Sequence, residues 1–561
     1  LAHLSIHVAS AQAGQAELTG EVRDQSGAVV PNAKITATET RSNQSYLTTA
    51  GASGVYTFTG LKPGLYTVTV EVAGFKRYVH EGVHLTTGEK VRLDAQLEVG
   101  AASEIITIKA DATLLRSESG SLGQVISNRK IVDLPLNGRT FLPLVALAPG
   151  VALPPASSFP RLNGGRPRTN EYLFDGISVL QPEPGQVAFF PIIDAIQEFK
   201  VETNSPPAEF GRFNGGVINL TTKSGTNEFH GSAFEFFRNE VLNARNLFAP
   251  KTASDPNKPV FRRNQFGFVL GGPVIKDKTF FFVDYQATRQ LIGRVRISTV
   301  PTLLQRKGIF TEPVGGVVPR IFDPATTKPK PGGGFTRDPF AGNQIPMSRI
   351  DPVALALLNR YPLPTSAATS NNFRRVANES DDQDQFDIRI DQRFSDKDQI
   401  FGRYSYAKDL INPVTPLAEG SGNITSGATG LTDTRGQSFA SNYLHIFNPR
   451  LSNELRFGYT RRSIDRKALL LDAPPSQSLK LPGIPSNAAF QNELPTFVID
   501  GFQQLGPSAN TDSDFRTDVT EIVNTVSLQR GRHSIKTGLD FRWERLDIIQ
   551  PPSPTGSFRF S

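Results

Sequence analysis

The sequence predicts a mainly β protein in three parts: an N-terminal β-sandwich, an α+β plug unit, and the first part of an antiparallel transmembrane β-barrel. Three observations predict this fold class. Short β runs near the N-terminus recur at a spacing of roughly ten residues, between Gly- and Pro-containing turns. Longer runs in the second half alternate apolar with charged side chains. The connections between these longer runs alternate between short and long, which is typical of a membrane barrel.

The composition limits the classes of function. Hydrophobic residues make up 38% of the chain, and 48 glycines and 41 prolines favour a turn-rich β protein. Cysteine is absent, which excludes a disulfide framework, a thiolate metal site and a cysteine nucleophile. The net charge of +7 is dispersed along the chain, so the sequence indicates no nucleic-acid partner. The sequence contains no apolar run of about 18 residues, so it predicts no transmembrane helix.

Residues 1–14 are apolar and small, and Ala11-Gln12-Ala13 resembles a signal-peptidase site. We interpret this segment as the remnant of a signal peptide; an ordinary flexible N-terminus is the alternative. Residues 15–100 follow as the predicted sandwich. Its runs, such as KITATE and LYTVTVEV, have an alternating pattern and are separated by turns at 24–27, 52–54 and 62–64.

Residues 101–224 form the predicted plug. Apolar residues between Ile131 and Leu147 have near-helical spacing, which Pro135 and Pro143 interrupt, so two short helices are expected. Runs near 172–179, 198–202 and 215–222 complete an α+β unit.

Residues 225–561 are the predicted barrel segment. In one run, Phe386, Ile388 and Ile390 alternate with Asp387, Arg389 and Asp391. A large soluble sandwich would alternate in the same way, but it has no reason to place every long loop at one end. The nine predicted strands are residues 229–238, 263–271, 279–289, 385–394, 399–407, 437–447, 453–462, 520–529 and 534–546.

A tenth strand is expected to begin at residues 556–561. Bacterial barrels have an even number of strands, and plugged transporters have 22. The sequence therefore predicts a barrel that is truncated at its C-terminal side.

Several motifs resemble known families. GEVRDQSGAVVPNAKITATET and GVYTFTGLKPGLYTVTVEVAGFK look like the carboxypeptidase regulatory-like domain, a transthyretin-like sandwich that is sometimes classed with carbohydrate-binding folds. LPLNGRTFLPLVALAPGV, LNGGRPRTNEYLFDGI and GFVLGGPVIKDKTFFFVDYQ resemble TonB-dependent outer-membrane receptors of the Oar-like group. The resemblance extends over approximately residues 15–561.

This resemblance implies a cell outer membrane location of the Gram-negative type, and no enzymatic activity. The implied partners are outer-membrane lipid, an unidentified extracellular substrate, and a TonB-type energy-transducing complex of the inner membrane. That complex would pull on a TonB box by β-strand addition. The best match for the box is Glu104, Ile105, Ile106, Thr107, Ile108 and Lys109, with a linker or last sandwich strand as the alternative.

Candidate plug–barrel contacts follow from the same motifs. The plug arginines Arg166, Arg168 and Arg212 are expected to pair with inward barrel carboxylates; the alternative is that they are solvated surface arginines. The candidate carboxylates are Glu235, Asp387 and Asp391.

No cofactor, catalytic residue or metal site is predicted. His80-Glu81-Gly82-Val83-His84 matches the HExxH zinc-protease pattern, but that pattern requires a helix, and its surroundings are β.

The function predicted from these features is uptake of a large or scarce substrate across the outer membrane, gated by a plug. The alternative is a surface binding or adhesion protein that uses the barrel as an anchor and the sandwich as a carbohydrate-binding module.

Overall fold

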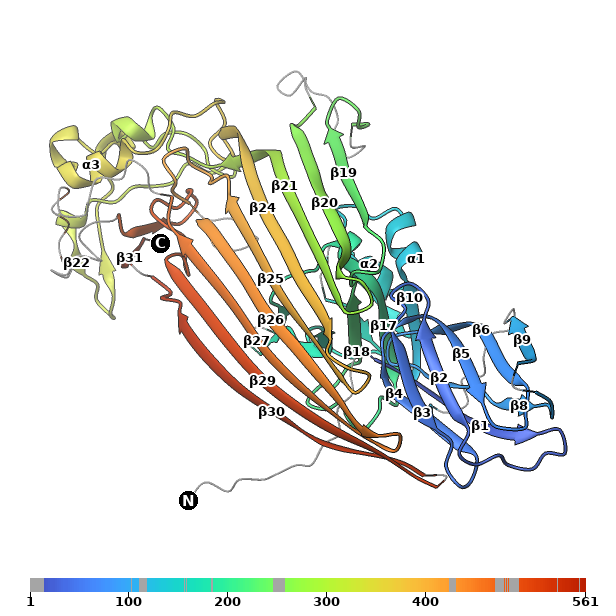
Figure 1. Ribbon diagram of the computed structural model, residues 1–561. Helices are drawn as coiled ribbons and strands as arrows, with labels where there is room; N and C mark the ends of the chain where they lie inside the picture. Colours follow the sequence, from blue (N-terminus) through green and yellow to red (C-terminus); the bar gives the residue numbers. More distant parts are fainter. Residues whose placement is uncertain are drawn as a thin grey trace.

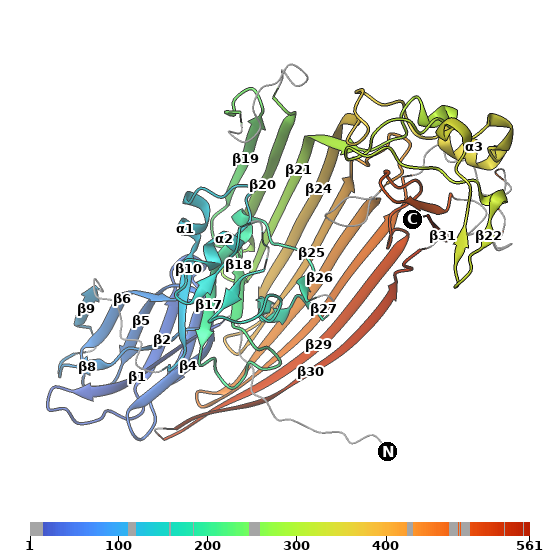
Figure 2. The same ribbon diagram turned by 180° about the vertical axis from the view of Figure 1, so that it is seen from behind.

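The computed structural model describes residues 15–101, 103–109, 119–155, 157, 159–182, 185–245, 258–422, 430–469, 479, 481, 483, 494–531, 533–553 and 555–560. The fold is mainly β, as predicted. A small sandwich lies beside one end of a large curved sheet, and an α+β plug lies against one face of that sheet (Figures 1 and 2). Among the described residues, no helix is long and apolar enough to cross a membrane. The predicted signal-peptide remnant at 1–14 lies outside the described residues.

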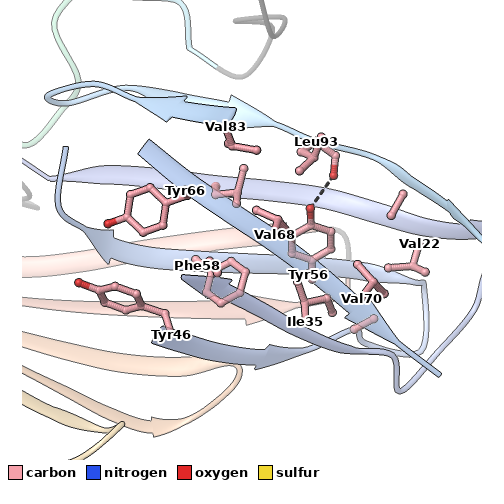
Figure 3. Packing of buried hydrophobic residues seen from close by; sticks show 14 of the residues in the cluster. Val22, Ile35, Tyr46, Tyr56, Phe58, Tyr66, Val68, Val70, Val83 and Leu93 are labelled. Atoms are coloured by element: carbon pink, nitrogen blue, oxygen red, sulfur yellow. Dashed lines mark hydrogen bonds between the residues drawn. The ribbon is translucent and has the colours of Figure 1, made fainter. Parts of the chain in front are cut away.

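The sandwich has two sheets. One has the strand order β3-β2-β5-β6-β9, and in the other β1 pairs with β4, β7 and β8. The strands are β1 (Ala16–Asp24), β2 (Lys34–Glu39), β3 (Ser45–Thr49), β4 (Val55–Leu61), β5 (Gly64–Glu71), β6 (Arg77–Leu85), β7 (Lys90–Arg92), β8 (Ala95–Leu97) and β9 (Ile105–Lys109). Alternate side chains point inward and fill one core (Figure 3). Within it, the Tyr56 hydroxyl donates a 2.6 Å hydrogen bond to the Leu93 carbonyl, which satisfies a buried polar group.

The plug is built on a mixed sheet with the order β10-β17-β18-β13-β14. Two short helices come before most of the sheet's strands in the chain, as predicted from the interruptions at Pro135 and Pro143. The elements are β10 (Leu122–Ser127), α1 (Asn128–Asp133), α2 (Leu142–Val145), β11 (Val151–Ala152), β12 (Arg161–Leu162), β13 (Glu171–Phe174), β14 (Ile177–Ser178), β15 (Leu180–Gln181), β16 (Gln186–Val187), η1 (Ile193–Ala195), β17 (Ile196–Asn204) and β18 (Val217–Thr222).

All nine predicted barrel strands are present, in one antiparallel sheet that follows chain order. Most are longer than predicted, because pairing extends into polar flanks that the alternation pattern does not mark. The strands are β19 (His230–Asn239), β20 (Phe261–Ile275), β21 (Thr279–Ser298), β24 (Phe373–Arg393), β25 (Asp398–Asn412), β26 (Leu431–Asn448), β27 (Leu451–Lys467), β29 (Ser513–Arg530) and β30 (His533–Ile549).

The two faces of this sheet differ in polarity. Asp387, Arg389 and Asp391 are buried on the face that carries the plug, whereas Ile388 and Ile390 are 44% and 51% exposed on the other face. A membrane barrel has this arrangement, with an apolar outer face and a polar lumen. The sheet does not close on itself, and β19 and β30 are its two edge strands.

The predicted alternation of connections is confirmed. The short turns follow β20, β24, β26 and β29, and the sandwich contacts this end. The described parts of the long connections, which follow β19, β21, β25 and β27, lie at the opposite end (Figure 1). Their elements are η2 (Gln305–Lys307), η3 (Pro324–Thr326), β22 (Lys328–Pro329), β23 (Phe335–Thr336), η4 (Ala341–Asn343), η5 (Met347–Arg349), α3 (Pro352–Leu358) and β28 (Thr496–Ile499).

The expected start of a tenth barrel strand is wrong in this structure. The segment forms β31 (Ser557–Phe560), which pairs in parallel with β28 among the long loops rather than with β30. Phe558 stacks on Phe497 with ring centroids 5.2 Å apart, so an aromatic contact accompanies this pairing.

Candidate plug-holding site

The tip of the β13–β14 hairpin carries a buried plug carboxylate. Asp175 and Gly176 form a two-residue turn with φ angles of 51° and 81°. A turn with positive φ at both positions strongly favours Asn or Asp followed by Gly. The sequence Phe174-Asp175-Gly176-Ile177 therefore forms the turn and also places the Asp175 side chain at its tip.

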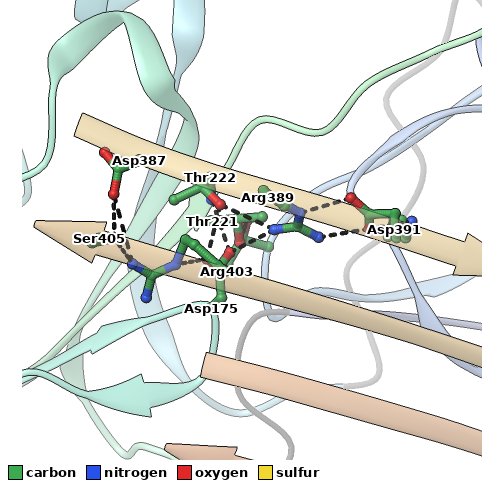
Figure 4. Close-up of polar contacts among 10 residues, drawn as sticks. Asp175, Thr221, Thr222, Asp387, Arg389, Asp391, Arg403 and Ser405 are labelled. Atoms are coloured by element: carbon green, nitrogen blue, oxygen red, sulfur yellow. Dashed lines mark hydrogen bonds and ion pairs between the residues drawn. The ribbon is translucent and has the colours of Figure 1, made fainter. Parts of the chain in front are cut away.

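Two barrel arginines meet this carboxylate (Figure 4). Arg389 Nη1 donates to Asp175 Oδ1 over 3.1 Å, and Arg403 Nε donates to Asp175 Oδ2 over 2.8 Å. Thr222 adds hydrogen bonds from its backbone N–H at 3.0 Å and from its hydroxyl at 2.8 Å. All four groups are buried.

The charge of Asp175 is stabilised by these neighbours. Burial opposes the charged form, but Arg389, Arg403 and the Thr222 hydrogen bonds outweigh it and hold the pKa of Asp175 below its ordinary value. Removing one partner of such a buried cluster leaves an unpaired charge, which costs about 3–5 kcal/mol. The cluster therefore attaches the plug to the barrel wall.

The same cluster continues into the sandwich. Arg389 also donates to Asp391 through Nε at 2.9 Å and Nη2 at 3.0 Å. Lys62 of the sandwich donates to Asp391 over 2.8 Å. A chain of alternating charges thus runs from the sandwich through the barrel to the plug.

A second plug–barrel cluster lies on the last two strands of the barrel sheet, β29 and β30. Arg542 in β30 contacts Glu171 of the plug at 3.0 Å and Glu521 in β29 at 2.8 Å. The backbone N–H of Ser178 donates to Glu521 over 2.8 Å, and the Ser178 hydroxyl donates to Glu171 over 2.7 Å. This cluster clamps both strands of the hairpin that carries Asp175.

A third cluster joins all three parts at the short-turn end. Lys536 in β30 lies 2.6 Å from Glu17 of the sandwich and 3.5 Å from Glu209 of the plug. Burial raises the pKa of Glu209 to about 7, against the lowering effect of Lys536. For Glu17, which is also buried, Lys536 and Lys90 outweigh burial and lower its pKa.

The sandwich and the plug also contact each other directly. The Thr87 hydroxyl lies 2.7 Å from Glu198 Oε1 and 3.0 Å from the Thr221 hydroxyl, and the Thr87 N–H also donates to Glu198. Lys200 Nζ donates to the Gly88 carbonyl over 2.9 Å. Burial raises the pKa of Glu198 to about 7, so this contact contains a carboxyl group that titrates near neutral pH.

The structure places the predicted contact residues in different environments. Asp387 and Asp391 both belong to the Asp175 cluster, and Asp387 accepts a hydrogen bond from Ser405. Arg212 lies 2.5 Å from Glu544 in β30, which is a plug–barrel ion pair with a carboxylate that was not predicted. Glu235 is exposed and lies opposite Phe266, on the outward face of the sheet.

The other two plug arginines do not reach the wall. Arg168 stacks within the plug, with its guanidinium 4.5 Å from the centre of the Phe159 ring. The Arg166 side chain is exposed and forms no ion pair with any residue that the structure describes. The sign of the expected pairing is therefore reversed at the main cluster, where the plug supplies the carboxylate and the barrel supplies the arginines.

Residues Glu104 to Lys109 lie at the edge of the sandwich. Strand β9 pairs in parallel with β6, with Ile106 opposite Tyr78 and Ile108 opposite His80. It is the last strand of its sheet, so its other edge pairs with no described strand. Most of its side chains are exposed.

The HExxH match lies along strand β6. Gly82 has a φ of 80°, and the pairing with β5 shifts by one residue there. This bulge places His80 inside the sandwich and His84 outside it. A single zinc ion cannot use both, and no group of three His, Asp or Glu side chains suited to a metal occurs in the described part of the chain.

Several residues of the site were missed by sequence reasoning, chiefly Asp175, Glu171, Arg403 and Arg542. The Asp-Gly dipeptide between short apolar runs was a readable sign of a tight hairpin. The arginines had no comparable signal beyond their inward parity in the alternating strands.

The comparisons with known proteins agree with this architecture. Residues 221–561 match the family described as outer membrane beta barrel domain, and residues 17–98 match the carboxypeptidase regulatory-like domain. The chain is similar to the TonB-dependent transporter Oar of Myxococcus xanthus, with 29% identity over 304 residues, which cover 51% of this chain and 28% of that protein.

Two solved structures are also similar. The outer membrane transporter YddB from Escherichia coli matches with 13% identity and a TM-score of 0.46, over 76% of this chain and 48% of that one. The siderophore receptor PirA from Acinetobacter baumannii matches with 14% identity and a TM-score of 0.45, over 77% and 49%.

The chain thus spans less than a third of the length of the curated relative and about half of each solved structure. The family match covers more than half of the chain and confirms the resemblance seen in the sequence motifs. The protein belongs to the outer membrane beta barrel domain family of the Gram-negative outer membrane, and it is similar in sequence to Oar-like TonB-dependent receptors.

Proposed function

We propose that this chain is the gated part of a transporter that takes up a large or scarce substrate across the outer membrane. The observation that carries the proposal is the buried contact of plug Asp175 with barrel Arg389 and Arg403. Polar and ionic contacts in a lumen can be exchanged for water when the plug moves, whereas a continuous apolar interface would resist removal more strongly. The plug is thus held firmly but can be released.

The three predicted parts then have separate roles. Residues 225–561 form part of the barrel wall, whose outward apolar side chains contact outer-membrane lipid. Residues 101–224 are the gate. Residues 15–100 form a domain on the periplasmic side, because short turns face the periplasm in this class of barrel and the sandwich contacts the short turns.

The energy input is proposed to act at Glu104–Lys109. Strand β9 lies at the periplasmic end, and its open edge can accept a strand from a TonB-type partner by β-addition. The same strand leads toward the plug along the chain, so tension applied there is transmitted to the plug.

The sandwich is proposed to restrain the gate. Lys62, Glu17 and Thr87 attach it to the barrel and the plug at three separate places. The plug cannot leave through the periplasmic end while these contacts persist. Release of the sandwich therefore precedes movement of the plug.

Labelling of a cysteine introduced into the plug tests this proposal in cells without a known substrate. Ser178 is buried between the plug and the wall, and the chain has no native cysteine. In Ser178→Cys receptor, we expect a membrane-impermeant maleimide to react several-fold faster in energised cells than after collapse of the proton gradient. Deletion of residues 104–109 should abolish the difference.

A control variant in the sandwich makes the result specific. Thr38→Cys lies in the sandwich and should react equally in energised and uncoupled cells. Equal labelling of the Ser178→Cys receptor under both conditions would contradict energy-driven gating, and would favour the alternative in which the barrel serves as an anchor for surface binding.

A further inference from the structure

The long loops line an open apolar cavity at the outer end of the barrel sheet. Its volume is about 430 Å³. We propose that this cavity binds an uncharged, apolar small molecule, or the apolar part of a larger one. This inference rests on the proposed function, since it names the class of substrate that the outer loops would collect.

Three separate loop segments and the end of β31 form the walls of the cavity. Residues 301–310 and 345–361 come from the connection between β21 and β24, and residues 497–505 come from the connection between β27 and β29. The aromatic residues of the described wall are Phe310, Tyr361, Phe497, Phe502 and, from β31, Phe560. None of the described lining residues carries a charge.

Hydrogen bonds outside the cavity hold these segments in place. Arg306 donates to the carbonyls of Tyr361 at 2.8 Å and Pro362 at 2.6 Å, which joins the first segment to the residues that follow α3. The Tyr361 hydroxyl donates to the Gln503 carbonyl over 2.6 Å, which joins the second segment to the third. The hydroxyl of the one tyrosine in the described wall is thus already engaged, and the wall offers mainly carbon to a ligand.

The loops also have a hydrophobic core of their own. Val300, Leu417, Leu494 and Leu505 are buried in one cluster with Tyr361. Backbone pairing of β28 with β31 adds rigidity to the third segment. A preformed wall lowers the entropy lost on binding.

The side chains that line the cavity determine which kind of ligand it favours. A charged group would lose its hydration in this cavity without gaining an ionic partner, which is strongly unfavourable. An apolar group would exchange contact with water for contact with aromatic and aliphatic side chains. The volume is within the range of about 300–1,000 Å³ that holds small-molecule ligands.

A matched pair of photoreactive probes tests this assignment on the purified full chain. Benzophenone is neutral and apolar, and 4-benzoylbenzoate has the same rings with a carboxylate added. After irradiation, labelled peptides are identified by mass spectrometry. We expect benzophenone to label residues 301–310, 345–361 or 497–505 at least tenfold more than 4-benzoylbenzoate does.

A matched pair of variants locates the site. Ala354→Phe fills the cavity from α3 and should reduce benzophenone labelling of these peptides at least tenfold. Ala356→Phe makes the same change on another side of α3, at a residue that does not line the cavity, and should preserve labelling. Ile350→Arg brings a charge to the wall of the cavity and should also reduce benzophenone labelling. It replaces Ala354→Phe if that variant does not fold.

The outcomes separate this inference from the proposed function. Equal labelling by both probes, or benzophenone labelling confined to the lipid-facing strands, would overturn the assignment of an apolar site. The assignment would also be overturned if neither Ala354→Phe nor Ile350→Arg changed the benzophenone labelling of the loops. The measurement needs neither a proton gradient nor residues 104–109, so failure of gating leaves its result intact.

Discussion

Arg389 in barrel strand β24 donates a 3.1 Å hydrogen bond to Asp175 at the tip of the plug hairpin. The same guanidinium also donates twice to Asp391, which Lys62 of the sandwich contacts at 2.8 Å. One arginine of the barrel wall thus links the plug to the sandwich. Substitutions at the partners of Arg389 should therefore loosen the plug. Substitutions at the contact between the sandwich and the plug should alter the release of the plug.

Asp175→Asn should loosen the plug. Asparagine tolerates the positive φ of this turn, so the hairpin is retained while the charge opposite Arg389 and Arg403 is lost. We expect a destabilisation of about 3–5 kcal/mol, measured by thermal unfolding of the purified receptor, and greater sensitivity of cells to large antibiotics. Asp277→Asn, at a turn residue with a φ of 62° and no ion pair to a described residue, is the control and should change both readouts much less.

Gly458→Val should displace the same hairpin by steric contact. A Cβ on Gly458 in β27 would lie only 2.2 Å from a side-chain carbon of Ile177. Overpacking of this kind costs about 1–3 kcal/mol, and single-channel recordings should show more frequent openings. Gly402 in β25 has no atom within 4 Å of the corresponding position. Similar openings in Gly402→Val and Gly458→Val would show that the plug contact is not the cause.

Glu198→Gln should change how stability depends on pH. The pKa of Glu198 rises from its ordinary 4.5 to about 7 because the folded protein buries the carboxyl. The folded state therefore holds a proton that the unfolded state has lost, so the free energy of unfolding falls as pH rises from 4.5 to 7. The slope for this group is at most about 1.4 kcal/mol per pH unit.

Unfolding should be measured at several pH values between 4.5 and 8. Glu198→Gln should remove its share of the slope and be more stable than the unmodified protein above pH 7. Glu209, whose pKa is also about 7, contributes in the same direction, so Glu198→Gln/Glu209→Gln should have the flattest profile. An unchanged slope in both variants would mean that these carboxyls ionise freely in the folded state.

A disulfide between the sandwich and the plug should lock the gate. The Thr87 and Thr221 hydroxyls are 3.0 Å apart, and the chain has no native cysteine to compete. In the Ser178→Cys background, oxidised Thr87→Cys/Thr221→Cys receptor should lose the energised labelling at position 178, and a reductant applied before the maleimide should restore it. The matched control is Thr38→Cys/Ser45→Cys, whose hydroxyls are also 3.0 Å apart but both lie in the sandwich.

Loss of gating in the first oxidised pair and not in the second would locate the restraint at the contact between the sandwich and the plug. If both pairs retain energised labelling, the sandwich moves together with the plug and does not restrain it.

The sequence by itself determined the β architecture of this protein. Alternation along a strand is a local property, because successive side chains point to opposite faces. It was therefore enough to locate nine barrel strands and the polarity of both faces. The lengths of the connections are also local, and they identified the end of the sheet at which the short turns lie.

Only the tertiary structure decided which charges meet. Asp175 and Arg389 are 214 positions apart, and no local pattern records which inward arginine faces which plug residue. Of the three carboxylates expected to pair with plug arginines, Asp387 and Asp391 therefore do lie in the lumen but have other partners, and Glu235 lies on the outward face.

The histidine pair shows the same limit on a smaller scale. Regular strand periodicity places His80 and His84 on one face, but the bulge at Gly82 turns them to opposite faces. Sequence periodicity predicts the face of a residue only while the register is unbroken. Long-range contacts, and the local irregularities that accommodate them, depend on how the three parts pack against one another.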